Sequence, residues 1–104
     1  MVFVETSLFS KLLPDYLGDD EYRGLQNYLI ERPDAGAILQ RSGGVRKVRW
    51  AAGGKGKSGG VRVIYYWLRA DDQIFLLTIY GKSEKADLSA DEFKRIVKLI
   101  EELK

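Results

Sequence analysis

The chain has 104 residues, 45% of them hydrophobic and 31% charged, with a formal net charge of +2, a composition typical of one folded domain spanning residues 1–104. It contains no cysteine and no histidine, which excludes disulfides, thiolate metal sites and every catalytic arrangement built on either side chain. Because neither a secretion signal nor a membrane-spanning apolar run is visible, we expect a cytoplasmic protein without a membrane partner.

The first segments predict a short strand followed by a helix. Residues 2–5 are rich in strand formers, and residues 6–17 have the pattern of a helix capped near Thr6 or Ser7. Pro14 is expected to bend or end this helix, because proline has no backbone N–H to donate.

A second helix is expected over residues 18–33. Asp19 is its predicted cap, and Pro33 is its predicted end. Its apolar stripe is Tyr22, Leu25 and Leu29.

Strict alternation predicts the next strand, over residues 45–51, after a connector that ends in "SGG". Val48 and Trp50 share one face of this strand, while Lys47 and Arg49 point to the other. One face is therefore expected to be core and the other cationic.

Two further strands are expected over residues 60–69 and 74–82, joined by a tight turn at 71–73, so that the last three strands form an antiparallel meander. Both faces of the first of these strands are largely apolar, which favours a central place in the sheet. One face carries Arg62, Ile64, Tyr66 and Leu68, and the other carries Val61, Val63, Tyr65 and Trp67.

A last helix is expected over residues 89–104, where Ser89 and Glu92 form a capping box. Its apolar stripe is Phe93, Ile96, Val97, Ile100 and Leu103. The order β-α-α-β-β-β-α predicts an α+β fold, in which a small, mostly antiparallel four-stranded sheet packs against helices.

Positive charge is concentrated in the middle third of the chain. Residues 35–70 contain eight basic side chains and no acidic one: Arg41, Arg46, Lys47, Arg49, Lys55, Lys57, Arg62 and Arg69. A solvated face is one interpretation, but the mutual repulsion of these charges favours a polyanionic partner. Nucleic acid is the leading ligand class.

The segment "AAGGKGKSGG" at residues 51–60 contains "GKS" at positions 56–58, which matches the end of the phosphate-binding loop motif of nucleotide hydrolases. Ala51 stands where that motif requires glycine, and the segment leads into a strand rather than a helix. We therefore interpret it as a hairpin connection, whose Lys55 and Lys57 can close on a phosphodiester chain.

Arg62 follows this loop on a strand that is otherwise apolar and aromatic. A guanidinium in such a place is costly unless it is paired or directed at an anion. An ion pair with a carboxylate from a packing helix and the binding of a phosphate are the two interpretations, and the second is favoured.

The segments "VRKVRWA", "GKGKSGG", "VRVIYY" and "LLTIYGKSEKADLS", in this order and with this element order, resemble the RelE/HigB toxins of bacterial type II toxin-antitoxin systems, especially the HigB branch. The resemblance covers nearly the whole chain. It implies a RelE-like fold and a metal-independent, cofactor-free endoribonuclease that cuts messenger RNA in the ribosomal A site. It also implies a cognate antitoxin, with a helix-turn-helix DNA-binding domain.

The resemblance also implies roles for particular residues. Arg62 corresponds to the strand arginine that stabilises the scissile phosphate in this family. The expected catalytic residues are Arg62, Lys55, Lys57, Tyr80 and Lys82, and the expected RNA-binding residues are Arg46, Lys47, Arg49 and Lys85.

Two departures leave the general base and acid open. Ser83 stands where the RelE pattern has an arginine, and Leu88 and Ser89 stand where it has a tyrosine. Tyr80, Tyr66 or a loop lysine are alternatives for these roles. A gyrase inhibitor like the ParE toxins and a plain RNA-binding module are the alternative functions, since a fold alone does not fix chemistry.

Overall fold

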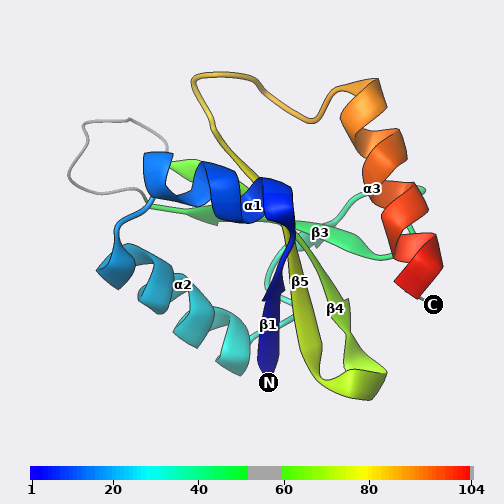
Figure 1. Ribbon diagram of the computed structural model, residues 1–104, viewed down its shortest axis with the longest axis horizontal. Helices are drawn as coiled ribbons and strands as arrows, with labels where there is room; N and C mark the ends of the chain where they lie inside the picture. Colours follow the sequence, from blue (N-terminus) through cyan, green and yellow to red (C-terminus); the bar gives the residue numbers. More distant parts are fainter. Residues whose placement is uncertain (52–59, 104) are drawn as a thin grey trace.

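The computed structural model describes residues 1–51 and 60–103, and within them five strands form one sheet in the order β1-β5-β4-β3-β2 (Figure 1). The strands are β1 (Val2–Glu5), β2 (Ala37–Ile38), β3 (Val45–Trp50), β4 (Val61–Leu68) and β5 (Gln73–Gly81). The helices are α1 (Ser7–Leu12), α2 (Asp19–Glu31) and α3 (Ala90–Leu103), with short 3₁₀ turns η1 (Leu13–Asp15) and η2 (Arg69–Asp71). Strand β1 is parallel to β5, and the other pairs are antiparallel. The α+β class and the β3-β4-β5 meander are thus confirmed.

The sheet has one strand more than the four expected. Strand β2 lies in the segment interpreted as a connector, where Ala37 pairs with Lys47 and Ile38 with Arg46. Two residues are too few to show an alternating pattern, so the strand exists through its pairing with β3 rather than through its own sequence.

The helix starts depend on local hydrogen bonds. Thr6 caps α1 as expected, because its hydroxyl accepts a hydrogen bond from the Phe9 N–H at 3.1 Å. The cap of α2 is Gly18 rather than Asp19, so that prediction is wrong. The N–H of Gly18 donates to the Glu21 carboxylate at 2.8 Å, which satisfies a backbone group at the start of the helix.

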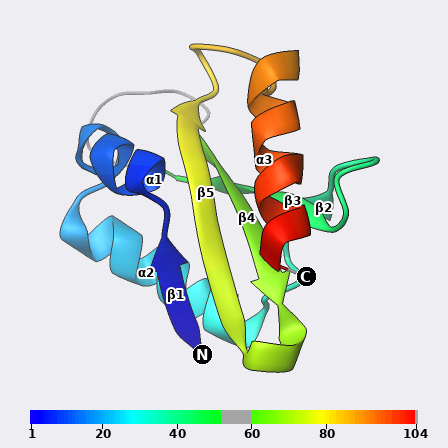
Figure 2. The ribbon, with the colours of Figure 1, turned by 45° about the vertical axis from the view of Figure 1, so that its right-hand side comes forward.

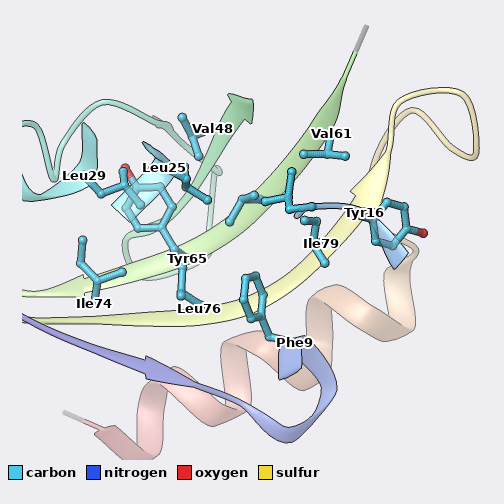
Figure 3. Packing of buried hydrophobic residues seen from close by; sticks show 12 residues of the cluster. Phe9, Tyr16, Leu25, Leu29, Val48, Val61, Tyr65, Ile74, Leu76 and Ile79 are labelled. Carbon is cyan, nitrogen blue, oxygen red and sulfur yellow. The ribbon is translucent and has the colours of Figure 1, made fainter. Parts of the chain in front are cut away.

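The larger of two core layers lies between the sheet and the helices α1 and α2 (Figure 3). Phe9 from α1 and Leu25 and Leu29 from α2 are fully buried there, against side chains of β4 and β5. Tyr65 of β4 lies at the centre of this layer, with its ring completely enclosed.

Helix α3 covers the opposite face of the sheet (Figure 2). Ile100 is buried against Ile64 and Tyr66 of β4 and Leu77 and Tyr80 of β5. Strand β4 is therefore buried on both faces, which confirms its central place and the two faces expected for it.

A β-bulge in β5 decides which side chains reach the α3 face. Ile64 pairs with Thr78 while Tyr65 pairs with Leu76, so Leu77 is the extra residue. Leu77 and Tyr80 consequently both belong to the cluster under α3. None of the helices in the described part of the chain is long and apolar enough to span a bilayer.

Candidate functional site

Three polar side chains form a transverse row across the three central strands, near the start of β4 and the ends of β3 and β5. Arg49 of β3 pairs with Arg62 of β4, and Arg62 pairs with Tyr80 of β5. Because direct cross-strand partners point to the same face, all three side chains lie on the face that α3 covers.

Arg62 is the buried arginine of this row, with only 8% of its surface exposed. One of its guanidinium nitrogens donates to the carbonyl of Val61 at 3.4 Å. Arg49, by contrast, is exposed on the neighbouring strand. The row therefore holds one guanidinium in a low-dielectric setting beside a second one that faces solvent.

Tyr80 is the third member, and it is 3% exposed. Within the described residues its hydroxyl is buried and has no hydrogen-bond partner. Burial raises the pKa of Tyr80, with a further increase from the Asp87 carboxylate, while the Arg62 guanidinium opposes both. The hydroxyl is therefore protonated at neutral pH and can act as a donor, not as a base.

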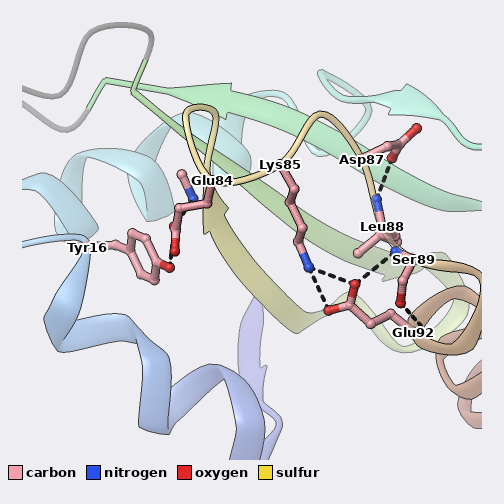
Figure 4. A network of polar contacts seen from close by, with 8 residues as sticks. Tyr16, Glu84, Lys85, Asp87, Leu88, Ser89 and Glu92 are labelled. Atoms are coloured by element: carbon pink, nitrogen blue, oxygen red, sulfur yellow. Dashed lines mark hydrogen bonds and ion pairs between the residues drawn. The ribbon is translucent and has the colours of Figure 1, made fainter.

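Lys85 lies beside this row, in the connection between β5 and α3. Its Nζ stands 5.0 Å from the centre of the Tyr80 ring, a cation–π arrangement. The same Nζ donates to both carboxylate oxygens of Glu92, at 2.6 and 2.7 Å (Figure 4). The hydrogen bonds from Lys85 are the largest cause of a lowered pKa of Glu92, and a hydrogen bond from the Ser89 backbone N–H lowers this pKa further.

Lys47 extends the site by one step along β3. It pairs with Ile64, one of the residues under α3, and its Nζ lies 3.6 Å from a carboxylate oxygen of Asp87. We use the name cationic site for the five side chains that the sheet and the following connection bring together. They are Lys47, Arg49, Arg62, Tyr80 and Lys85.

The remaining predicted residues lie elsewhere or outside the described residues. Arg46 points to the opposite face, where its guanidinium donates to the backbone carbonyls of Asp34 and Gly36 at 3.0 and 2.8 Å. Lys82 is exposed at the end of β5, and its backbone N–H donates to the Gly60 carbonyl at 3.3 Å. Lys55 and Lys57 fall within 52–59, outside the described residues.

Sequence reasoning missed two acidic members of this region. The carboxylates of Asp87 and Glu92 form ion pairs with Lys47 and Lys85, respectively. Glu92 was expected only as a helix cap. Its capping role is also present, since the Ser89 N–H donates to Glu92 at 2.9 Å and the Glu92 N–H to the Ser89 hydroxyl at 3.1 Å. The charge distribution indicates only that Lys47 needs a partner from another segment, because residues 35–70 contain no acid.

Of the three residues that depart from the RelE pattern, Leu88 and Ser89 have structural roles here, since Leu88 packs at the edge of the cluster under α3 and Ser89 caps that helix. Ser83 is exposed. Within residues 1–51 and 60–103, no three acidic side chains gather in a way that could hold a metal ion. The chemistry that the described site can supply is electrostatic stabilisation of an anion by fixed cations, together with one protonated hydroxyl.

Comparisons with known proteins add two findings. The family model described as RelE toxin of the RelE/RelB toxin-antitoxin system matches residues 28–104. The chain is also similar to a solved structure of the E. coli toxin RelE in the free state, a mutant with two arginines changed to alanine. The TM-score is 0.62 at 17% sequence identity, over 95% of this chain and 96% of the other.

Proposed function

The chain belongs to the RelE toxin family, and on that premise we propose that it is a ribosome-dependent endoribonuclease that cuts messenger RNA in the ribosomal A site. The observation that supports this proposal is the transverse row of Arg49, Arg62 and Tyr80, flanked on the same face by Lys47 and Lys85. A single-stranded polyanion that reaches this part of the face would meet Lys47 and Arg49 on β3, Arg62 on β4 and Lys85 on the connection after β5.

RNA supplies its own nucleophile for this reaction. The 2′-hydroxyl attacks the adjacent phosphorus, the bond to the 5′-oxygen breaks, and the products are a 2′,3′-cyclic phosphate and a 5′-hydroxyl end. The 2′-oxygen loses a proton to a base, and the leaving 5′-oxygen gains one. In-line positioning and neutralisation of the charge that develops on the phosphate account for most of the acceleration that such a site can give.

In this proposal Arg62 stabilises the charge on the scissile phosphate. Its burial strengthens the interaction, because a guanidinium in a low-dielectric setting attracts an anion more strongly than one in water. Lys47, Arg49 and Lys85 hold the RNA backbone, and RNA phosphates replace the carboxylates of Asp87 and Glu92 on the two lysines.

The two proton transfers are assigned to different side chains. Tyr80 remains protonated at neutral pH, which suits proton donation to the leaving oxygen. A lysine of the glycine-rich loop, Lys55 or Lys57, is proposed as the base, and Lys82 as an additional phosphate ligand. No metal or cofactor takes part in these steps.

As a member of a toxin-antitoxin family, the protein has an antitoxin as its partner. We propose that this antitoxin carries a helix-turn-helix DNA-binding domain, that it silences the toxin by covering the cationic site, and that both proteins act in the cytoplasm. Mutual repulsion among Lys47, Arg49 and Arg62 makes an acidic segment the expected cover.

The test is induction of Arg62→Ala in a growing culture, with primer extension on cellular transcripts. We expect no growth arrest and no cuts from this variant, while its circular dichroism spectrum stays that of the unchanged protein. Arg23→Ala, an exposed arginine on α2, is the matched control and should remain toxic. Undiminished cleavage by Arg62→Ala would refute the proposal, and so would growth arrest by the unchanged toxin with intact transcripts and damaged DNA, the outcome expected of a gyrase inhibitor.

A further inference from the structure

A tyrosine–carboxylate contact holds the connection that carries Lys85. The hydroxyl of Tyr16 donates to Oε1 of Glu84 at 2.5 Å, and the backbone N–H of Gly81 donates to the same oxygen at 2.7 Å (Figure 4). We propose that Tyr16 and Glu84 are positioning residues that fix the connection between β5 and α3, and with it Lys85, over the cationic site. This inference rests on the proposed function.

Tyr16 is held rigidly on its own side of the contact. It follows the 3₁₀ turn that Pro14 helps to form, and its N–H donates to the Leu13 carbonyl at 3.0 Å. Its ring belongs to the core layer under α1 and α2, where only 9% of the residue remains exposed. The hydroxyl is thus presented from the packed body of the protein to a loop on the surface.

Glu84 is held against the end of β5 at the other side of the contact. Its backbone N–H donates to the Gly81 carbonyl at 3.0 Å, which closes a tight turn over positions 81–84. The carboxylate folds back over Gly81 so closely that a Cβ at position 81 would lie 2.9 Å from Oε1. A side chain at position 81 would therefore require the Glu84 carboxylate to shift from this place.

The connection is consequently anchored at both of its ends. Tyr16 and Glu84 fix it where it leaves β5, and the capping box of Ser89 and Glu92 fixes it where it enters α3. Lys85 lies between these anchors, with its Nζ over the Tyr80 ring. Release of the first anchor lets Lys85 move relative to Arg62 and Tyr80 without removing any charge from the site.

The experiment uses ribosomes programmed with a short messenger RNA and purified toxin in excess. We expect Tyr16→Phe to lower the cleavage rate at saturating toxin by about tenfold, since small misplacement of a positioned group costs this much or more. The toxin concentration that gives half the maximal rate should stay unchanged, because every cation is retained. Glu84→Ala should show the same loss, whereas Glu84→Gln, which keeps an acceptor oxygen for both donors, should cut nearly as fast as the unchanged protein.

Tyr22→Phe is the matched control. Tyr22 also donates to a carboxylate, Oε2 of Glu5 at 2.6 Å, and its ring also packs on the core layer under α1 and α2. The Tyr22→Phe variant therefore loses a hydrogen bond of the same kind, and that bond has no connection to the cationic site. Amide hydrogen exchange at Gly81, measured by NMR, gives a readout without RNA, and it should accelerate in Tyr16→Phe and stay unchanged in Tyr22→Phe.

The outcomes separate the two proposals. Cleavage by Tyr16→Phe as fast as by Tyr22→Phe would overturn the inference alone, and so would a raised half-saturating concentration with an unchanged maximal rate. An absence of cleavage by the unchanged toxin would overturn the proposed function, and the role of the anchor with it. Slow cleavage by Tyr16→Phe with rescue in Glu84→Gln and faster exchange at Gly81 would support the inference.

Discussion

Arg49 and Arg62 stand directly opposite each other on neighbouring antiparallel strands. Like charges in this relationship destabilise a sheet, so the arrangement costs the protein stability. The same relationship places two guanidiniums side by side on the face that we propose binds RNA. This arginine pair therefore lowers the stability of the fold, while we propose that it favours the binding of RNA.

Arg49→Thr should change stability and RNA affinity in opposite directions. Removing the like charge, and placing a good strand former on β3, should raise the free energy of unfolding by roughly 0.2–1 kcal/mol in urea titrations. Affinity for single-stranded RNA should fall several-fold, with a salt slope shallower by about 0.7. Lys47→Thr on the same strand faces Ile64, so it should lose affinity without the gain in stability. A drop in stability of Arg49→Thr would contradict the prediction.

Asp87→Asn should tighten RNA binding. The Asp87 carboxylate lies 3.6 Å from the Lys47 Nζ and competes with a phosphate for it, so its loss frees one cation. The dissociation constant for a short single-stranded RNA should fall at a fixed salt concentration, and the salt slope should steepen by up to about 0.7. Asp71→Asn, at the exposed turn before β5, carries the same charge change away from the site and supplies the baseline. Equal effects of the two variants would mean that only net charge matters.

Tyr65→Phe should destabilise the fold. The Tyr65 hydroxyl accepts from the Gly36 N–H at 2.9 Å and donates to the Pro33 carbonyl at 2.8 Å, inside a fully buried environment. Its removal leaves a buried N–H without a partner, which costs about 1–3 kcal/mol of unfolding free energy. Urea unfolding is the measurement, and Tyr28→Phe, on an exposed ring, should remain within about 0.5 kcal/mol of the unchanged protein.

Glu92 should make stability dependent on pH in the acid range. Its bonds to Lys85 and Ser89 lower its pKa in the folded protein. Its contribution to the free energy of unfolding is therefore complete above the pKa of a glutamate in the unfolded chain, about 4.3. This contribution is lost as the pH falls through the lower pKa of Glu92 in the folded protein. Glu92→Gln should be less stable than the unchanged protein at neutral pH, and the difference should vanish in acid. A difference independent of pH in thermal unfolding would contradict this.

The sequence predicts those parts of the fold in which local pattern and packing agree. Strand β1 has the bounds expected for it, and β4 is central because both of its faces are apolar. Strand β2 and the Gly18 cap could not be predicted, because each depends on a partner supplied by another element or by a side chain three residues on.

The cationic site was only partly predictable. The alternation of β3 places Arg46 on the same face as Val48 and Trp50, and in the structure its guanidinium does lie on that side, where it donates to backbone carbonyls. Charge counts, on the other hand, contain no information on which acids pair with which cations. Asp87 reaches Lys47 only because the connection after β5 crosses the sheet toward β3.

The parallel pairing of β1 with β5 has a consequence for synthesis of the chain. The hydrogen bond from the Thr6 hydroxyl to the Leu77 carbonyl joins positions 71 residues apart. Contacts of such long sequence separation form late, after the intervening chain has been made and has collapsed. Strand β1 of the nascent polypeptide thus waits for a partner that is synthesised about 70 residues later, and the sheet cannot be completed before β5 has been made.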